Sequence, residues 1–176
     1  MSTRVACLRL PRFPLLALAG GPEADVRPVA VAAPGPGERV QVPSAALLER
    51  GVWAGMRIAA ARALASDLDV RPWDEGAIAR AVNAVTTALL DASPQVTPGA
   101  PGLWWIGAHG LGSLGGERAL LGRVLQVARA WHPGARAAVA SSCVAARAAT
   151  FLEREAPVIP PGQDAAFLAR APLALL

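Results

Sequence analysis

The chain has 176 residues, which is enough for one sizeable domain with a small inserted lobe. Its 17 basic residues are all arginine and its net charge is +4, a balance that permits contact with nucleic acid without demanding it. Charged residues make up only 17% of the chain, which argues against wholesale disorder, and no uninterrupted apolar run reaches the ~18 residues of a membrane span.

The first quarter of the chain predicts short strands followed by a helix. Arg4–Leu10 and Pro28–Ala33 are apolar runs typical of buried strands. The turn residues Pro34–Gly37 end the second run, and Arg39–Val42 is expected to return as its antiparallel partner. Ser44 is a plausible N-cap for the short helix that follows.

The N-terminal region also has some features of a signal peptide. Three arginines precede the apolar run Phe13–Gly20. That run is short for a signal peptide and contains a proline, and the residues before it are better interpreted as a strand. Cys7 and Cys143 lie in separate apolar segments and are expected to be reduced, buried thiols, which favours a cytoplasmic protein.

The rest of the chain alternates helices and strands, and its two long helices each carry an apolar stripe at helical spacing. The predicted elements are a helix opened by Asp74 and ended by Ser93-Pro94, a strand at Leu103–Ile106, a helix at Glu117–Trp131, a strand at Arg136–Ala140, a helix from Ser141 or Ser142 to about Arg154, and a short helix at Asp164–Arg170. The long detour before Asp74 predicts an α+β fold with an insertion.

The segment Gly51–Leu68 resembles the fingers of Y-family translesion DNA polymerases, of the UmuC/DinB type. A turn closes on Gly55-Met56, and an alanine-rich helix then runs to Asp67-Leu68. The order of the elements is similar to the palm and fingers of that superfamily, above all to its divergent, catalytically inactive ImuB-like branch. The resemblance implies a palm with a ferredoxin-like sheet and two packed helices at 1–33 and 74–176, and a fingers-like insertion at 34–73.

The resemblance also locates the positions where active members of the superfamily carry their metal-binding carboxylates. Arg9 occupies the place of the acid on the first strand, and Gly102 and Leu103 occupy the place of the central acidic pair. Ala45 and Leu48 replace the Tyr and Arg that hold the incoming triphosphate. Two-metal phosphoryl transfer requires carboxylates around the ions, so we expect no catalysis, no bound nucleotide, no metal and no cofactor.

By resemblance, the expected function is that of a non-catalytic adaptor in translesion synthesis, DNA repair and damage-induced SOS mutagenesis. The implied partners are an error-prone replicative-type polymerase, an ImuA-like protein and the sliding clamp, with DNA bound weakly if at all and no membrane contact. Arg147, Arg154, Arg57 and Arg62 are candidate contacts to DNA phosphates.

Besides weak residual nucleotidyltransferase activity, which would need acids at positions other than those named above, two alternative functions remain open. Gly110–Gly115 spells Gly-x-Gly-x-x-Gly between a predicted strand and a predicted helix, which is the context of a dinucleotide-binding turn. A protein-interaction module or remnant without a DNA role is the other alternative. Trp104 and Trp105 alternate along a strand, so one ring should face the core. The other ring is either covered by a helix or free to stack on nucleic-acid bases.

Overall fold

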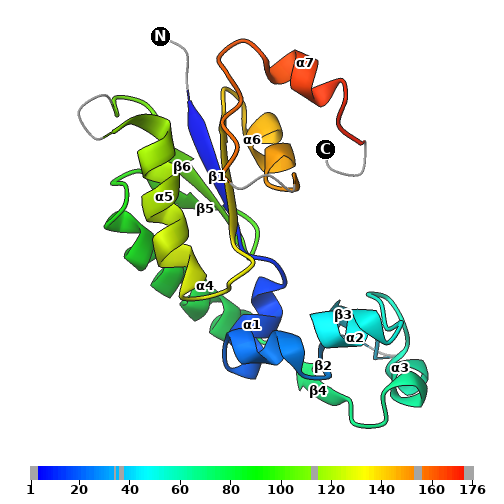
Figure 1. Ribbon diagram of the computed structural model, residues 1–176. Coiled ribbons are helices and arrows are strands. Elements are labelled where there is room, and N and C mark those ends of the chain that lie inside the picture. Colours follow the sequence, from blue (N-terminus) through cyan, green and yellow to red (C-terminus); the bar gives the residue numbers. More distant parts are fainter. Residues whose placement is uncertain (1–3, 34, 36–37, 112–114, 153–155, 173–176) are drawn as a thin grey trace. The chain divides into compact units, whose positions relative to one another are not determined.

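Figure 1 shows the computed structural model, which describes the chain except for residues 1–3, 34, 36–37, 112–114, 153–155 and 173–176. Its elements confirm the predicted α+β class. In chain order they are β1 (Val5–Arg9), α1 (Phe13–Ala19), the 3₁₀ helix η1 (Pro22–Val26), β2 (Val29–Ala32), β3 (Val40–Pro43), α2 (Ala45–Glu49), α3 (Ile58–Leu64), β4 (Asp69–Pro72), α4 (Glu75–Leu90), β5 (Val96–Pro98), β6 (Leu103–Gly107), α5 (Gly116–Arg129), β7 (Arg136–Ala140), α6 (Cys143–Ala149) and α7 (Asp164–Leu168).

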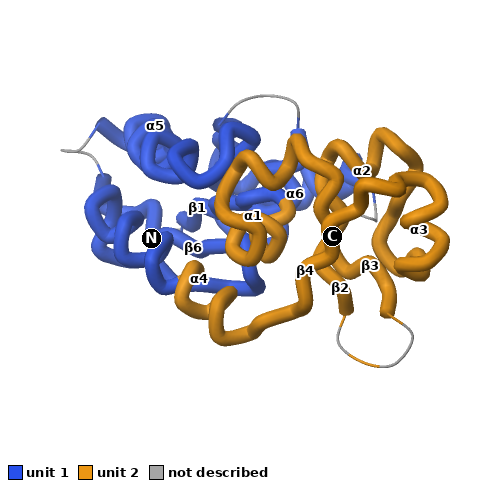
Figure 2. The backbone as a smooth tube through the Cα atoms, turned by 90° about the horizontal axis from the view of Figure 1, so that it is seen from below, with its two compact units in different colours: residues 1–11, 83–176 blue, residues 12–82 orange. Residues whose placement is uncertain are grey.

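The chain forms two compact units, which are coloured separately in Figure 2. Unit 1 comprises Met1–Pro11 and Asn83–Leu176, and unit 2 comprises Arg12–Val82. These bounds differ from the predicted segments because β2 pairs with β3 and β4, so its residues belong with the insertion. The assignment of the parts to a palm and to fingers stays a prediction.

Unit 1 is built on a four-stranded antiparallel sheet in the order β5-β6-β1-β7. Central β1 is buried at Ala6, Cys7 and Leu8, as an apolar strand between two neighbours should be. Because successive side chains of a strand point to opposite faces, Ala6 and Leu8 share one face of the sheet, and Cys7 shares the other with Arg9.

The face of Leu8 is covered by long helices. Trp104 lies opposite Leu8 in the β1–β6 register, is 0% exposed, and donates from Nε1 to Thr86 Oγ1 of α4 at 2.9 Å. Helix α5 contacts β1 and β7. Its buried side is formed by Leu120, Leu121, Val124, Leu125 and Ala128. Val127 and Trp131 are only half-buried, because the row formed by residues 121, 125 and 128 faces the interior instead.

The opposite face carries α6 on a layer of small side chains. Cys7, Ala138 and Ala140 of the sheet form one core cluster with the alanines of α6 at 145, 146 and 149. Trp105 packs against this cluster, which favours the helix-covered interpretation of the second tryptophan. Ser142 caps the helix, as one of the two predicted serines, by accepting from Ala145 N at 3.3 Å. The helix ends at Ala149, earlier than predicted.

Unit 2 contains a second, three-stranded sheet in the order β3-β2-β4. The apolar run with signal-peptide features forms α1, and its Leu15 and Ala19 are core residues packed with Val29 and Val31 of β2. Ser44 caps α2 as predicted. Its Oγ accepts a hydrogen bond from the backbone N–H of Leu47 at 3.2 Å. No helix within the described residues is both long and apolar enough to cross a bilayer.

The two cysteines lie in different environments. Both are free; Cys7 is buried in the sheet, and Cys143 at the start of α6 is exposed, so the prediction of two buried thiols is wrong for Cys143. Burial raises the pKa of the Cys7 thiol to about 12. Its contribution to stability is therefore complete below its ordinary pKa of 9.0 and is lost as the pH rises toward 12, since the unfolded chain releases that proton first.

We expect a disulfide reagent such as DTNB to label one thiol rapidly at mildly alkaline pH, and the second only after unfolding. The exposed Cys143 supplies the fast reaction because the reagent can reach it, whereas Cys7 keeps its proton and is covered. The variant Cys143→Ser should abolish the fast phase. A fast phase that survives in this variant would show that Cys7 is reached in the native state.

Candidate functional site

The three positions that the resemblance assigns to metal-binding acids lie together at one end of the sheet of unit 1. Arg9 and Leu103 are direct partners in the β1–β6 register. The next residue of the chain, Leu10, donates its backbone N–H to Gly102 O at 2.8 Å. Positions more than ninety residues apart in the sequence are thus neighbours in the fold.

Arg9 makes contacts that stabilise a helix end. Its Nε donates to Thr150 Oγ1 at 3.1 Å and its Nη2 donates to Thr150 O at 3.0 Å, just beyond the last turn of α6. Its Cζ also lies 4.0 Å from the centroid of the Phe151 ring. A cation at the carboxyl end of a helix interacts favourably with the partial negative charge there. The described geometry therefore accounts for Arg9 as a structural link between β1 and α6.

The described residues contain no group of three or more His, Cys, Asp and Glu side chains placed to hold a metal ion. Gly102 is buried and Leu103 is half-buried against the alanine cluster of α6. The roles of these residues stay predictions.

The two positions expected to replace a triphosphate grip lie on α2 in unit 2. Ala45 begins the helix, and its backbone N–H donates to Asp25 Oδ1 at 2.8 Å. Asp25 also forms an ion pair with Arg12. Leu48 is 46% exposed on the same helix. The carboxylate near Ala45 is therefore engaged in holding α2 and η1 together.

The candidate DNA-contacting arginines divide between the two units. Arg57 precedes α3 and Arg62 lies within it, and both are exposed on unit 2. Arg147 is exposed on α6 of unit 1. Arg154 lies outside the described residues.

Sequence reasoning missed an exposed aromatic residue in the turn that carries the family resemblance. Trp53 is 60% exposed, while Val52 before it and Met56 after it are core residues. The signal was present in the motif, because a Gly-Val-x-x-Gly-Met turn that buries its Val and Met leaves the three positions between them facing solvent. Trp53 occupies the first of these positions.

A concave region of unit 1 lies apart from the assigned positions. It has a volume of about 550 Å³, and Arg170 is the only charged side chain among its described lining residues. These residues are Ala148, Leu152, Ile159, Pro160, Gln163, Ala166, Phe167, Arg170, Ala171 and Pro172. Neither Arg9 nor Leu103 belongs to this set, so the hollow is not the predicted metal site.

The glycine-rich turn that suggested a dinucleotide site is described only at its ends. Gly110 and Gly115 both adopt positive φ, 70° and 84°, which glycine tolerates without strain. Residues 112–114 between them lie outside the described residues. The dinucleotide alternative stays a hypothesis.

The fold as a whole matches solved structures of Y-family DNA polymerases. No protein-family model matches the chain, and a search of curated proteins finds no match either. An insertion ternary complex of Dbh DNA polymerase has 15% identity and a TM-score of 0.75, covering 98% of this chain and 53% of the other. DinB from Sulfolobus solfataricus has 14% identity and a TM-score of 0.68, covering 92% and 49%. A Dbh–Dpo4 Y-family polymerase chimera has 12% identity and a TM-score of 0.65, with the same coverage as DinB.

Over nearly all of its length, the chain shares its fold with the Y-family DNA polymerases. It spans about half the length of those solved structures. The matches also correct one prediction. The expectation that the chain is not an enzyme is wrong on this comparison, because the solved structures that share the fold are DNA polymerases. That expectation depended on matching single residues of this chain to motif positions of the family, and the identity to the solved structures is only 12–15%. A shift of one residue in such a match moves every side chain of a strand to the other face of the sheet.

Proposed function

We propose that this chain is the palm-and-fingers module of a Y-family-type protein and that it binds primer–template DNA during synthesis past damaged bases. The observation that carries the proposal is the match to the ternary complex of Dbh DNA polymerase over 98% of the chain at a TM-score of 0.75. The similarity covers elements of both compact units rather than a single common motif.

The charge of the chain supports a nucleic-acid ligand. The net charge is +4, and three of the four candidate arginines, Arg57, Arg62 and Arg147, are exposed among the described residues. Guanidinium groups on a surface contact phosphates in a sequence-independent way, which suits a protein that must accept any template.

The finer part of the proposal concerns the cellular role. By its motif order we place the chain in the ImuB-like branch, without carrying over that branch's inactivity, and we propose that it acts in the cytoplasm in damage-induced mutagenesis. There it would assemble with an error-prone replicative-type polymerase, an ImuA-like protein and the sliding clamp. This assignment rests on the motif order from Gly51–Leu68 onward.

The proposal predicts salt-dependent binding of labelled primer–template DNA, measured by fluorescence anisotropy at about 50 mM and about 200 mM salt. The combined variant Arg57→Gln, Arg62→Gln and Arg147→Gln should reduce the slope of log K against log salt by about 2 to 3, since each lost phosphate contact removes about 0.9. Arg71→Gln is the matched control, because Arg71 is exposed but paired with Asp69.

An absence of primer–template binding by the intact chain at low salt would overturn the proposed function. A triple variant with an unchanged salt slope would instead remove these arginines from the interface. Nucleotide incorporation is followed in the same reactions, because the solved structures that share the fold are polymerases.

A further inference from the structure

Trp53 stands on a turn that the core of unit 2 holds in place. The neighbouring Val52 is 0% exposed, and Met56 is buried in the same cluster as Leu47 and Ile58. Met56 N donates to Trp53 O at 3.2 Å, which closes the turn. The indole is nevertheless 60% exposed. A large aromatic ring is thus displayed to solvent on a rigid support.

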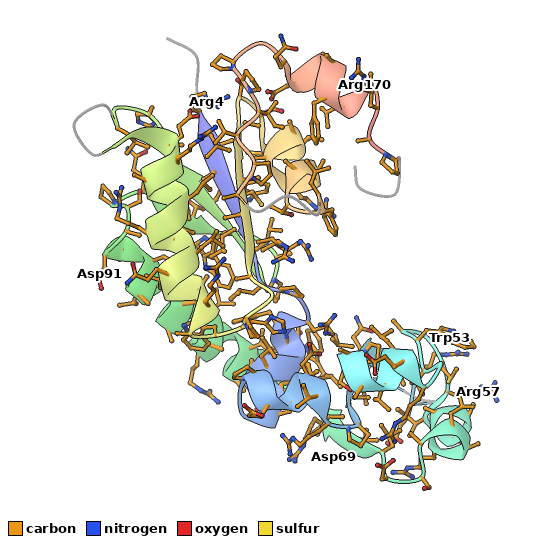
Figure 3. All side chains as sticks on the ribbon, in the orientation of Figure 1. Arg4, Trp53, Arg57, Asp69, Asp91 and Arg170 are labelled. Carbon is orange, nitrogen blue, oxygen red and sulfur yellow. The ribbon has the colours of Figure 1, made fainter. Side chains whose placement is uncertain are left out.

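Two arginines lie beside this turn. Arg39 and Arg57 are partners in an isolated antiparallel bridge, and partners of this kind project toward the same face. Arg39 Nη1 donates to Gly55 O at 2.7 Å, two residues after Trp53. Both arginines are exposed, and Figure 3 shows Trp53 and Arg57 at the same end of unit 2. The turn that carries the ring therefore has two exposed arginines beside it.

The acidic groups near the turn do not neutralise these arginines. Neither Arg39 nor Arg57 takes part in an ion pair among the described residues, whereas nearby Arg50 is paired with Asp67 at 2.6 Å. Glu38 precedes Arg39 directly, and neighbours along an extended segment point to opposite faces. The surface around Trp53 consequently retains positive charge.

We infer that Trp53, Arg39 and Arg57 form a binding site for single-stranded nucleic acid, in which an unpaired base stacks on the indole and the arginines contact the adjoining phosphates. Every base has a π face, so stacking on an exposed aromatic ring tolerates any sequence, and neighbouring cations supply the electrostatic attraction. A base in a duplex keeps its faces covered by its neighbours, so the site selects an unpaired strand. This inference rests on the proposed function and names the part of the DNA that unit 2 would hold.

The test compares two single strands of the same length, about 12 nucleotides, one of thymidine and one of abasic sugar-phosphate units. The intact chain should bind the thymidine strand more tightly and show quenched tryptophan fluorescence. Trp53→Ala should weaken that binding roughly 5- to 100-fold, which corresponds to the loss of one stacked base, and leave abasic binding unchanged. Trp53→Phe should recover part of the affinity.

Matched variants separate stacking from charge. The double variant Arg39→Gln, Arg57→Gln should weaken the binding of both strands to the same extent, because both strands contain phosphates. Val26→Ala replaces an apolar residue that is 72% exposed in the same unit, and it should leave the affinity for both strands unchanged. Equal affinity of the intact chain and Trp53→Ala for the thymidine strand would overturn the inference and leave the turn as a surface for a protein partner.

Failure of the inference is distinguishable from failure of the proposed function. If primer–template DNA binds and Trp53→Ala has no effect on single strands, the inference is wrong and the proposed function stands. If single strands bind through Trp53 but primer–template DNA is not preferred over blunt duplex, the inference stands and the polymerase-type function fails. Absence of binding to every nucleic acid overturns both.

Discussion

Replacing Trp104 by alanine is expected to destabilise unit 1 by about 3–5 kcal/mol, the range for deleting a large aromatic side chain from a packed core. Trp104 is 0% exposed and heads the group of largest fully buried side chains. It lies opposite Leu8 on the central strand, and its Nε1 donates to Thr86 Oγ1 at 2.9 Å. The substitution therefore removes this hydrogen bond between β6 and α4 as well as the buried volume.

Urea unfolding followed by far-ultraviolet circular dichroism measures this loss. Trp104→Phe should have a smaller effect, since it keeps an aromatic ring but loses the hydrogen bond to Thr86. Trp105→Ala is the matched control on the neighbouring residue, which is only half-buried on the opposite face. If Trp105→Ala were as damaging as Trp104→Ala, the assignment of Trp104 to the main core would be wrong.

Local signals predicted most of the regular structure. The strands at 5–9, 29–32, 103–107 and 136–140 coincide with apolar runs bounded by turn residues, and the composition of such runs predicts strands. Ser44, Asp74 and Ser142 each cap a helix through the side-chain oxygen, because the unpaired N–H groups of a helix start favour these residue types. These features depend on neighbours within a few residues.

The elements that the sequence did not reveal depend on distant partners. Helix α1 has apolar residues on most sides and begins with Phe13-Pro14, so its composition did not distinguish it from a signal-like run. Strand β4 contains Asp69, Arg71 and Pro72, a poor strand sequence, and exists because it pairs in parallel with buried β2. Tertiary contact overrode intrinsic preference in β4.

The candidate site shows the same division. Arg9 and Leu103, which the family motifs assign to one site, are direct strand partners, and their roles stay predictions. The motifs gave no indication that Arg9 would bind Thr150, because the ends of α6 and β1 meet only after the sheet forms. An arginine that caps a helix and an arginine that contacts DNA look alike in a sequence, and only burial and partners separate them.

The loss of Arg4 is the second large effect that we expect. Arg4 is 7% exposed, lies just before β1, and is labelled in Figure 3. Its Nη2 donates to Glu117 Oε2 at 2.8 Å and to Ile159 O at 2.8 Å, and its Nη1 donates to Ser141 Oγ at 3.0 Å. The hydrogen bonds with Glu117 raise the pKa of Arg4. A single guanidinium thus joins the start of α5, the end of β7 and the segment before α7.

Arg4→Met should therefore cost about 3–5 kcal/mol in unfolding free energy, because it leaves the Glu117 carboxylate largely covered and without its partner. Adding Glu117→Met should restore much of the loss, since removing both charges also removes their desolvation cost. Arg71→Met is the matched control: its pair with Asp69 is exposed and should be worth less than about 1 kcal/mol.

The double-mutant cycle decides what the network contributes. A coupling energy of about 2 kcal/mol or more between Arg4 and Glu117, measured by urea unfolding, would show that their ion pair itself stabilises unit 1. Additive losses would show instead that Arg4 acts through Ser141 and the Ile159 carbonyl. The two residues lie 113 positions apart in the sequence, so no local pattern predicts the ion pair. Its interaction energy depends on the fold that brings the two side chains together.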